Sequence, residues 1–436
     1  MKRTLIALAV SLLACALLIS CGGGYSSGSL PPSGLTFRAF VSNPLHVGPT
    51  GGIFPALQIV NATTDVESNL GVALSSALPD AGMMVLSPDK KRTLVVSPSS
   101  ARIAVVDNAT EKVTTSISLP GNTQSLFVWT DNTSAFVAIP SAPIQGQAAG
   151  GVGKFNIVTA AVTATIPVPS AHYLVSSPTG NQILVFSDNS NAVTLLFPGL
   201  LTTGSQTNTQ VPCPGVPIAA CAVSGFDRPV WGVFSTDGTT AYIFNCGREC
   251  GGSSNASIVP LNMGTLVPGT PIQLISGGLV GGATTGLLSG NLLYVAGTPS
   301  SIACGMGSAA ATCGVLSVID TTSSSVTTAV LIPDGYHNGM QMGANGQLFI
   351  GSQTCTNVTT STETRGCLAI YDTVRSLVVV PPETGDVTGI EPIPNRSVVY
   401  VCQGGGMQIY DTKTDLLQTT QVNIVGQAID VLVVDF

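Results

Sequence analysis

Cysteine and histidine are the side chains that most often carry redox, metal or nucleophilic chemistry, and this 436-residue chain has 11 of the first and 3 of the second. Setting aside Cys15 and Cys21 near the start, most of the cysteines form pairs that are close in sequence. The pairs are Cys213 with Cys221, Cys246 with Cys250, Cys304 with Cys313, and Cys355 with Cys367. In an exported chain, local pairs predict disulfides, and Cys402 is left without a partner.

Zinc is the alternative for Cys246 and Cys250, which could both face one ion. The sequence has no paired CxxC and no CxxCH haem motif, so we expect disulfides, no metal site and no cofactor. It also lacks GxSxG, Walker, HExxH and EF-hand motifs. Only His46, His172 and His337 could serve as the base of a hydrolase triad.

A set of polar residues stands at or just before the start of short apolar runs. Its members are Asp80, Gln124, His172, Arg228, His337, Asp386 and Gln427. Whether these side chains can act together depends on whether the fold gathers the runs that follow them.

The apolar runs belong to a repeat. An apolar run, an Asp turn, a threonine-rich spacer and a second apolar run occur in IAVVDNATEKVTTSISL (103–119), LSVIDTTSSSVTTAVLI (316–332) and MQIYDTKTDLLQTTQV (407–422). A hairpin such as MMVLSPDKKRTLVVSP precedes each copy. Each unit therefore predicts four short strands joined by tight turns. Residues Asp107, Asn156, Asp320, Asp372 and Asp411 occupy comparable turn positions in the second hairpin.

Four strands in each unit of about 40 to 58 residues are typical of propeller blades. First strands near 83, 126, 173, 230, 284, 340, 387 and 428 predict eight blades, and a misread unit around 190–230 or 284–313 would leave seven. Residues 36–74 predict the second, third and fourth strands of a blade that lacks its first strand. Residues 428–436 predict a first strand that lacks the other three. We expect the C-terminal strand to close the ring, because an open stack of repeats does not explain these ends. The body is predicted to be all-β.

The repeat resembles the YVTN family of bacterial propellers, whose blades pair an SPDG-like inner turn with a VIDT-like outer turn. The resemblance covers nearly all of residues 36–436. It is strongest at 83–119 and 387–422, and weakest in the outer strands of 190–210.

The N-terminus has the layout of a secretory signal, with Lys2 and Arg3 before an apolar stretch from Leu5 to Ile19. The residues LISC, ending at Cys21, resemble the bacterial lipobox, in which the cysteine is lipidated, palmitate included, after cleavage. The alternative is an ordinary signal with a chance cysteine. We expect a signal peptide at 1–20, a lipidated Cys21 with a flexible tether at 21–35, and a propeller at 36–436. Gly22 resembles the sorting signal of lipoproteins of the outer membrane.

Charge limits the partners. The chain has 15 Lys and Arg against 22 Asp and Glu, and only 8% of its residues are charged. Such a chain lacks the basic surface that nucleic acids need, so we expect no nucleic-acid partner. We expect a monomer that is lipid-anchored in the bacterial cell envelope, at the outer membrane, and that faces either the periplasm or the cell surface.

In a propeller the first strands line the central channel, so the seven polar residues above would form a ring at its mouth. The loops that hold the cysteine pairs should share that face, where a protein or glycan could bind. Both features have an explanation that needs no ligand. Polar residues at a channel mouth are solvated by water, and disulfides stabilise long loops. We favour a non-enzymatic binding or scaffolding module. The alternative is a channel enzyme of the lactonase, hydrolase or quinone-dependent dehydrogenase type, with Asp386, His337 and Arg228 as candidate groups.

Overall fold

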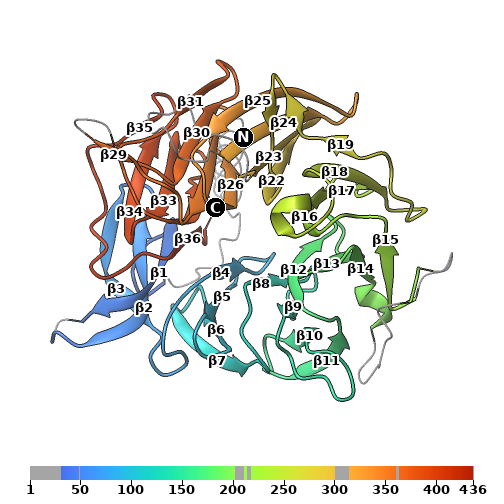
Figure 1. The fold of residues 1–436 in the computed structure, drawn as a ribbon. Coiled ribbons are helices and arrows are strands. Elements are labelled where there is room, and N and C mark those ends of the chain that lie inside the picture. Colours follow the sequence, from blue (N-terminus) through green and yellow to red (C-terminus); the bar gives the residue numbers. More distant parts are fainter. Residues whose placement is uncertain are drawn as a thin grey trace, which may run out of the picture.

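The computed structural model describes residues 31–48, 50–201, 211–213, 218–299, 314–359 and 363–435. These residues form a closed ring of eight four-stranded antiparallel sheets, the blades of a β-propeller (Figure 1). The all-β prediction and the count of eight blades are confirmed, and the alternative of seven is wrong.

Each blade has an inner strand at the channel and three strands that follow outward. From blade 1 to blade 8 the inner strands are β36 (Asp430–Val433), β4 (Met84–Leu86), β8 (Ser125–Val128), β12 (Ala171–Ser176), β16 (Pro229–Phe234), β22 (Thr285–Ser289), β26 (Tyr336–Met342) and β32 (Val387–Pro392). The second strands are β1 (Arg38–Val47), β5 (Arg92–Ser97), β9 (Ser134–Ile139), β13 (Ile183–Ser187), β17 (Thr240–Asn245), β23 (Leu292–Gly297), β27 (Gln347–Gln353) and β33 (Val398–Gln403).

The outer half of each blade is a second hairpin. The third strands are β2 (Ile53–Asn61), β6 (Arg102–Asp107), β10 (Gly151–Asn156), β14 (Ala192–Leu196), β18 (Ser257–Asn262), β24 (Gly314–Asp320), β30 (Leu368–Asp372) and β34 (Gly406–Asp411). The fourth strands are β3 (Val66–Ala73), β7 (Lys112–Ser118), β11 (Val162–Pro167), β15 (Ala220–Ser224), β19 (Ile272–Gln273), β25 (Ser325–Ile332), β31 (Leu377–Val379) and β35 (Leu416–Leu417). Two short hairpins lie outside the blades, β20–β21 (Ile275–Ser276 and Leu279–Val280) and β28–β29 (Val358–Thr359 and Thr364–Arg365).

The C-terminal strand closes the ring, as the sequence predicts. Strand β36 pairs with β1 from Ala39 opposite Val433 to Ser42 opposite Asp430, and it becomes the inner strand of blade 1. Arg38 strengthens the join, since its guanidinium donates to Asp435 beyond β36 and to Glu111 of blade 2. The opposite side of blade 1 is tied to blade 8 by the ion pair between Arg396 and Asp65.

One turn recurs between the third and fourth strands. In the example of blade 2, the Asp107 carboxylate accepts the Thr110 amide at 2.8 Å, and Glu111 has a positive φ of 52°. The same spacing joins Asn61 to Asp65, Asn156 to Ala160, Asn262 to Leu266, Asp320 to Ser324, Asp372 to Ser376, and Asp411 to Asp415. An Asn or Asp side chain that bonds the backbone just after it initiates such turns, so the predicted turn positions are confirmed.

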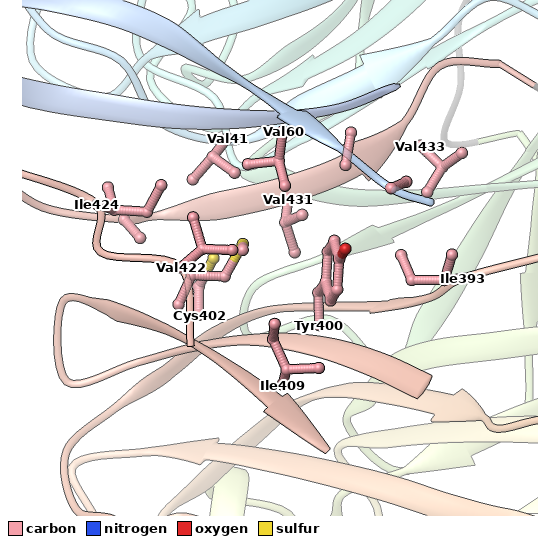
Figure 2. Close-up of a cluster of buried hydrophobic side chains, with 14 of the residues drawn as sticks. Val41, Val60, Ile393, Tyr400, Cys402, Ile409, Val422, Ile424, Val431 and Val433 are labelled. Carbon is pink, nitrogen blue, oxygen red and sulfur yellow. The ribbon is translucent and has the colours of Figure 1, made fainter. Parts of the chain in front are cut away.

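The hydrophobic core consists of clusters between neighbouring blades. In blade 1, Val41 packs toward blade 8 and the adjacent Phe40 toward blade 2, because successive side chains of a strand point to opposite faces. Figure 2 shows the first of these layers, in which Val41, Val60 and Val431 of blade 1 meet Tyr400 and Ile409 of blade 8. Both faces of each middle strand are buried, which explains why these strands read as unbroken apolar runs.

Three of the four predicted disulfides form in the described residues, and the zinc alternative for Cys246 and Cys250 is wrong because their sulfur atoms are bonded to each other. Bonds also join Cys213 to Cys221 and Cys355 to Cys367. The pair Cys304 and Cys313 lies outside the described residues. The thiol of Cys402 is free and buried in the layer between blades 8 and 1, where burial raises its pKa.

The first disulfide differs from the prediction in its location. We expected Cys213 and Cys221 in a loop on the face of the channel mouth, but Cys221 lies within β15, the fourth strand of blade 4. Pro212 makes a parallel bridge to Ala222, and the Cys213 amide donates to the Ala222 carbonyl, so this disulfide staples the outer edge of the blade. The sequence signal failed here because the third-to-fourth connection of blade 4 is much longer than the usual turn.

The first described residues already contact the ring. The Ser33 amide donates to Glu111 at 2.8 Å, and Leu35 packs against the layer between blades 1 and 2. The predicted boundary at residue 36 thus falls within a contacting segment, and the predicted leader at 1–20 and Cys21 lie outside the described residues. No helix in the described part of the chain is long and apolar enough to cross a bilayer.

Candidate binding site in the central channel

The two faces of the ring carry different connections. Strand direction alternates outward through each blade, so the segments that enter the inner strands and those that join second to third strands share one face, called here the mouth face. The disulfides Cys246–Cys250 and Cys355–Cys367 lie in second-to-third connections and therefore belong to this face. The third-to-fourth turns and the beginning of β1 lie on the opposite face.

A cavity of about 560 Å³ occupies the channel. It is lined from the inner strands or their entry segments in all eight blades. Threonine, serine, asparagine and glutamine provide most of its polar surface, and Met83, Leu126, Met340 and Ile390 are among its apolar groups. The volume falls in the range of pockets that enclose small organic molecules.

An aromatic cluster forms one wall of the cavity. The Tyr173 ring meets the Trp231 ring edge to face, with centroids 5.5 Å apart, and the His172 ring stacks on Tyr173 at 4.2 Å. The Tyr173 hydroxyl lies 2.9 Å from the hydroxyl of Tyr336, which comes from blade 7. Burial, and secondarily Tyr336, raises the pKa of Tyr173, so its hydroxyl stays protonated and can donate. These rings offer flat, hydrogen-bonding surfaces to a ligand.

A carboxyl group faces the cavity from the strand that closes the ring. Asp430 begins β36, and its two oxygens accept the Met84 amide at 2.7 Å and the Val431 amide at 2.9 Å. Burial raises its pKa to about 7 in spite of these two hydrogen bonds, which favour the charged form. The carboxyl is therefore partly ionised near neutral pH.

Glu391 lies beside this group on β32 of blade 8. Its Oε1 accepts the Val433 amide at 3.0 Å. Burial raises the pKa of Glu391 to about 7, and the charge of Asp430 raises it further. Two carboxyl groups of neighbouring inner strands thus titrate in the same range and can act as proton donor and acceptor at neutral pH.

The structure brings two of the seven predicted site residues into contact. The His172 Nε2 lies 3.2 Å from the Gln124 Oε1, and its Nδ1 lies 2.7 Å from Asp188 in the turn between β13 and β14. Gln124 lines the cavity, while His172 reaches it through its stacking on Tyr173.

Four other predicted residues lie at entries to inner strands and bond the loops of the mouth face. The carboxylate of Asp386 accepts the Thr354 amide at 2.7 Å. The Arg228 Nε donates to the Gly251 carbonyl at 3.3 Å. The carboxylate of Asp80 accepts hydrogen bonds from the Ser97 hydroxyl and the Ser99 amide. The backbone amide of Gln427 donates to the side-chain oxygen of Asn43. These residues hold loops together, and none of the four is among the residues that line the cavity.

His337 is separate from the cavity. Its side chain is 1% exposed and packs between blades, with Nε2 3.0 Å from the Pro333 carbonyl and Gly314 against the ring. Its Nδ1 has no hydrogen-bond partner in the described chain, and burial lowers the pKa of His337 to about 4. His337 therefore does not supply a base to the channel. His46 lies beside a second cavity of about 330 Å³ between β1, β2 and β3.

Sequence reasoning missed the residues that give the cavity its character, namely Tyr173, Tyr336 and Asp430, and it missed Glu391 beside Asp430. The two tryptophans of the chain differ in their placement. Trp129 does pack, since its indole donates to the Gly180 carbonyl of the next blade, but Trp231 lines the cavity. The available signal was strand register, because these residues lie at the start of or within inner strands and so can face the channel.

Comparisons with known proteins show the fold alone. No family model matches the chain, and neither does any curated protein. Among solved structures, the dihydro-heme d1 dehydrogenase NirN in complex with DHE is similar, with a TM-score of 0.61, 12% identity, and coverage of 93% of this chain and 78% of that one. A functionally unknown protein from Desulfotomaculum acetoxidans DSM 771 has a TM-score of 0.46, 12% identity, and coverage of 91% and 98%. The hydrazine synthase of Kuenenia stuttgartiensis has a TM-score of 0.43, 13% identity, and coverage of 76% of each chain.

Proposed function

We propose that this protein is a lipid-anchored propeller of the bacterial cell envelope, of the YVTN-repeat type, that binds a small organic ligand in its central channel. The observation that carries the proposal is the cavity itself. It is built by all eight blades, it has an aromatic wall, and among the described lining residues one carboxyl group, that of Asp430, faces it. A channel filled by packed side chains would give the ring the same stability without such a space.

The anchor rests on the sequence, in which LISC ends the apolar leader and a Gly/Ser/Pro stretch follows. Multiple lipid chains at Cys21 would hold the protein on a membrane. The resemblance of Gly22 to the outer-membrane sorting signal supports the outer membrane as the place of the anchor. The chain enters the ring on the face of the Glu111 turn, opposite the mouth face. An anchor at Cys21 would therefore leave the mouth, with its two stapled loops, directed away from the bilayer.

The anchor is tested by replacing Cys21 with Ser. The protein should move from the membrane fraction to the soluble fraction and lose incorporation of an alkyne fatty acid fed to the cells. The matched control is Cys15→Ser, which changes a cysteine within the leader and should keep both membrane association and labelling. A Cys21→Ser protein that keeps its label and its membrane association would show that the anchor is wrong.

Binding in the channel can be followed by the fluorescence of Trp231. The chain has 2 tryptophans, so a Trp129→Phe background leaves Trp231 as the sole indole. A ligand that enters the cavity should change this emission and raise the melting temperature by mass action. Excision of the loop closed by Cys355 and Cys367 should leave channel binding intact. Loss of both signals on that excision would move the site from the channel to the loops of the mouth face.

The loops remain candidates for a second partner, a protein or a glycan, because stapled loops on a rigid scaffold are where recognition commonly occurs. Capture of such a partner should fall when the loops at 304–313 and 355–367 are replaced by short Gly/Ser linkers. Capture that is indifferent to the replacement would leave these loops with a structural role only.

Asp430 and Glu391 favour a second candidate function, a channel enzyme that uses general acid–base chemistry. Two carboxyl groups with pKa values of about 7 are suited to proton transfer at neutral pH. The described residues contain no group of three His, Cys, Asp or Glu side chains that could hold a metal ion. Turnover of lactones or other esters that disappears in Asp430→Asn would establish the enzyme, and binding without turnover would support the binding protein.

A further inference from the structure

The described residues that line the channel include an acidic side chain and no basic one. Among the described residues that line the cavity, the ionisable ones are Asp430 and the two tyrosines Tyr173 and Tyr336. None of them is a lysine, arginine or histidine. The nearest histidine, His172, already contacts Asp188 and Gln124 at the mouth. The cavity thus has an acid without a base.

Asp430, which is partly exposed to the cavity, differs in this respect from the buried carboxylates that hold the ring. Glu111 meets Arg38, Asp65 meets Arg396, and Asp415 meets Arg375. The oxygens of Asp430 accept two backbone amides, and no ion pair joins Asp430 to a described residue. A carboxylate that lines a confined cavity and is bound only by neutral donors is well placed to pair with a positively charged group.

The aromatic side chains that line the cavity can contact an organic cation and its apolar body. Trp231, Tyr173 and Tyr336 present aromatic rings, and the negative faces of such rings attract ammonium groups. Gln124, Asn338 and Gln341 add neutral polar groups. An anion entering the same space would lose its hydration beside Asp430 and would find no basic side chain among the described lining residues.

We propose that the ligand of the channel is an organic cation, an amine or quaternary ammonium group attached to an aromatic or apolar body, with Asp430 as the counter-ion and the rings of Trp231 and Tyr173 against the body. This inference rests on the proposed binding function. It goes further by excluding anionic ligands, including carboxylate-bearing cofactors, from the channel.

The test compares three meta-substituted phenols, of which the cation and the neutral probe have nearly the same shape and the anion carries a smaller, flat group. They are meta-hydroxyphenyltrimethylammonium, its neutral carbon isostere meta-tert-butylphenol, and the anion meta-hydroxybenzoate. Titration calorimetry and Trp231 fluorescence, with the disulfide-bonded protein at pH 8, measure each affinity. We expect the cation to bind at least tenfold more tightly than the neutral isostere, and the anion to bind most weakly.

Asp430→Asn isolates the carboxylate. The cation should lose its advantage of tenfold or more, while the affinity of the neutral phenol stays within about twofold. The matched control is Glu67→Gln, which removes a partly buried carboxyl at the second cavity and should leave all three affinities unchanged. If Asp430→Asn does not melt cooperatively, Trp231→Leu gives a second reading, because it should weaken the cation more than the phenol.

The pH dependence offers an independent measurement. The groups that face Asp430 are Glu391 on β32 and the Cys402 thiol on β33. Because the cation requires ionised Asp430, its affinity should be about tenfold lower at pH 6 than at pH 8, while the phenol should show little change over that range.

The possible failures are distinguishable. If the neutral phenol binds as tightly as the cation, or if the anion binds best, the cation inference is overturned and the channel remains a binding site. If no probe changes the fluorescence or the heat at millimolar concentration, both this inference and the proposed small-ligand function are overturned.

Discussion

The hydroxyl groups of Tyr173 and Tyr336 lie 2.9 Å apart although 163 positions separate the two residues in sequence. Tyr173 is in the inner strand of blade 4, and Tyr336 begins the inner strand of blade 7. Their hydrogen bond therefore spans the channel at its mouth and links two blades that share no interface.

The contribution of this bond can be measured with a double-mutant cycle of Tyr173→Phe and Tyr336→Phe. A hydrogen bond of this kind contributes about 0.5–1.5 kcal/mol, and we expect a coupling energy in that range from denaturant unfolding. Each single variant should also increase the association rate of a channel ligand, because the entrance is less restricted. Additive effects on stability would show that the two hydroxyls do not interact in solution.

The raised pKa of Asp430 predicts a pH-dependent stability. The folded protein holds the proton of this carboxyl up to a pH of about 7, whereas the unfolded chain releases it near its ordinary value, so stability is lost as pH rises between these values. Asp430→Asn removes this loss. The melting temperature of the variant relative to wild type should therefore be higher at pH 8 than at pH 5. A constant difference across that range would contradict the raised pKa.

His337 predicts the opposite slope. Its pKa is lowered to about 4 by burial, so the unfolded chain binds a proton near pH 6.5 that the folded protein does not accept. Stability should fall as pH drops from about 6.5 to 4, by up to about 3 kcal/mol for a shift of this size. His337→Gln keeps a donor for the Pro333 carbonyl and should flatten this decline. Unfolding measured in urea at pH 7, 6 and 5 provides the check.

Closure by β36 predicts that deletion of 428–436 is severely destabilising. The deletion removes strand β36, which pairs with β1 and carries the buried residues Val431 and Val433. It also removes the Asp435 carboxylate that accepts from Arg38. The exposed edge of β1 should then promote association between molecules. Light scattering and thermal melting of the truncated protein test this expectation, and a monomer with an unchanged melting temperature would count against a closed ring. Lys413→Ala, at an exposed turn of blade 8, is the control: this variant should stay monomeric and keep the melting temperature of the wild type.

The blades could be predicted because their signals are local. Asn156 and Asp320 mark turns by bonding the backbone two or three residues later, and the apolar runs mark strands buried on both faces. The outer edge of blade 4 was the exception, since the third-to-fourth connection there spans many residues and the disulfide of Cys221 lies within the strand itself.

The site was less predictable because it depends on which way a side chain points. Tyr336 and His337 are neighbours in sequence, yet the tyrosine lines the cavity and the histidine is buried between blades. The sequence pattern located the start of the inner strand but did not distinguish these two directions. Asp430 was missed for a similar reason, because it reads as an ordinary residue of a closing strand until the Met84 amide and Glu391 are placed beside it.

The pairing of β1 with β36 also sets the order in which the molecule can be completed. Synthesis delivers β1 before every other strand of the ring, with Phe40 and Val41 among its apolar residues, and its inner neighbour β36 is the last strand to be made. Seven blades can form from segments that are adjacent in sequence, whereas blade 1 stays incomplete until β36 is available. The cell must therefore shield one apolar strand until the last blade has been made, and any chain that ends early remains recognisable by that strand to a protease or chaperone.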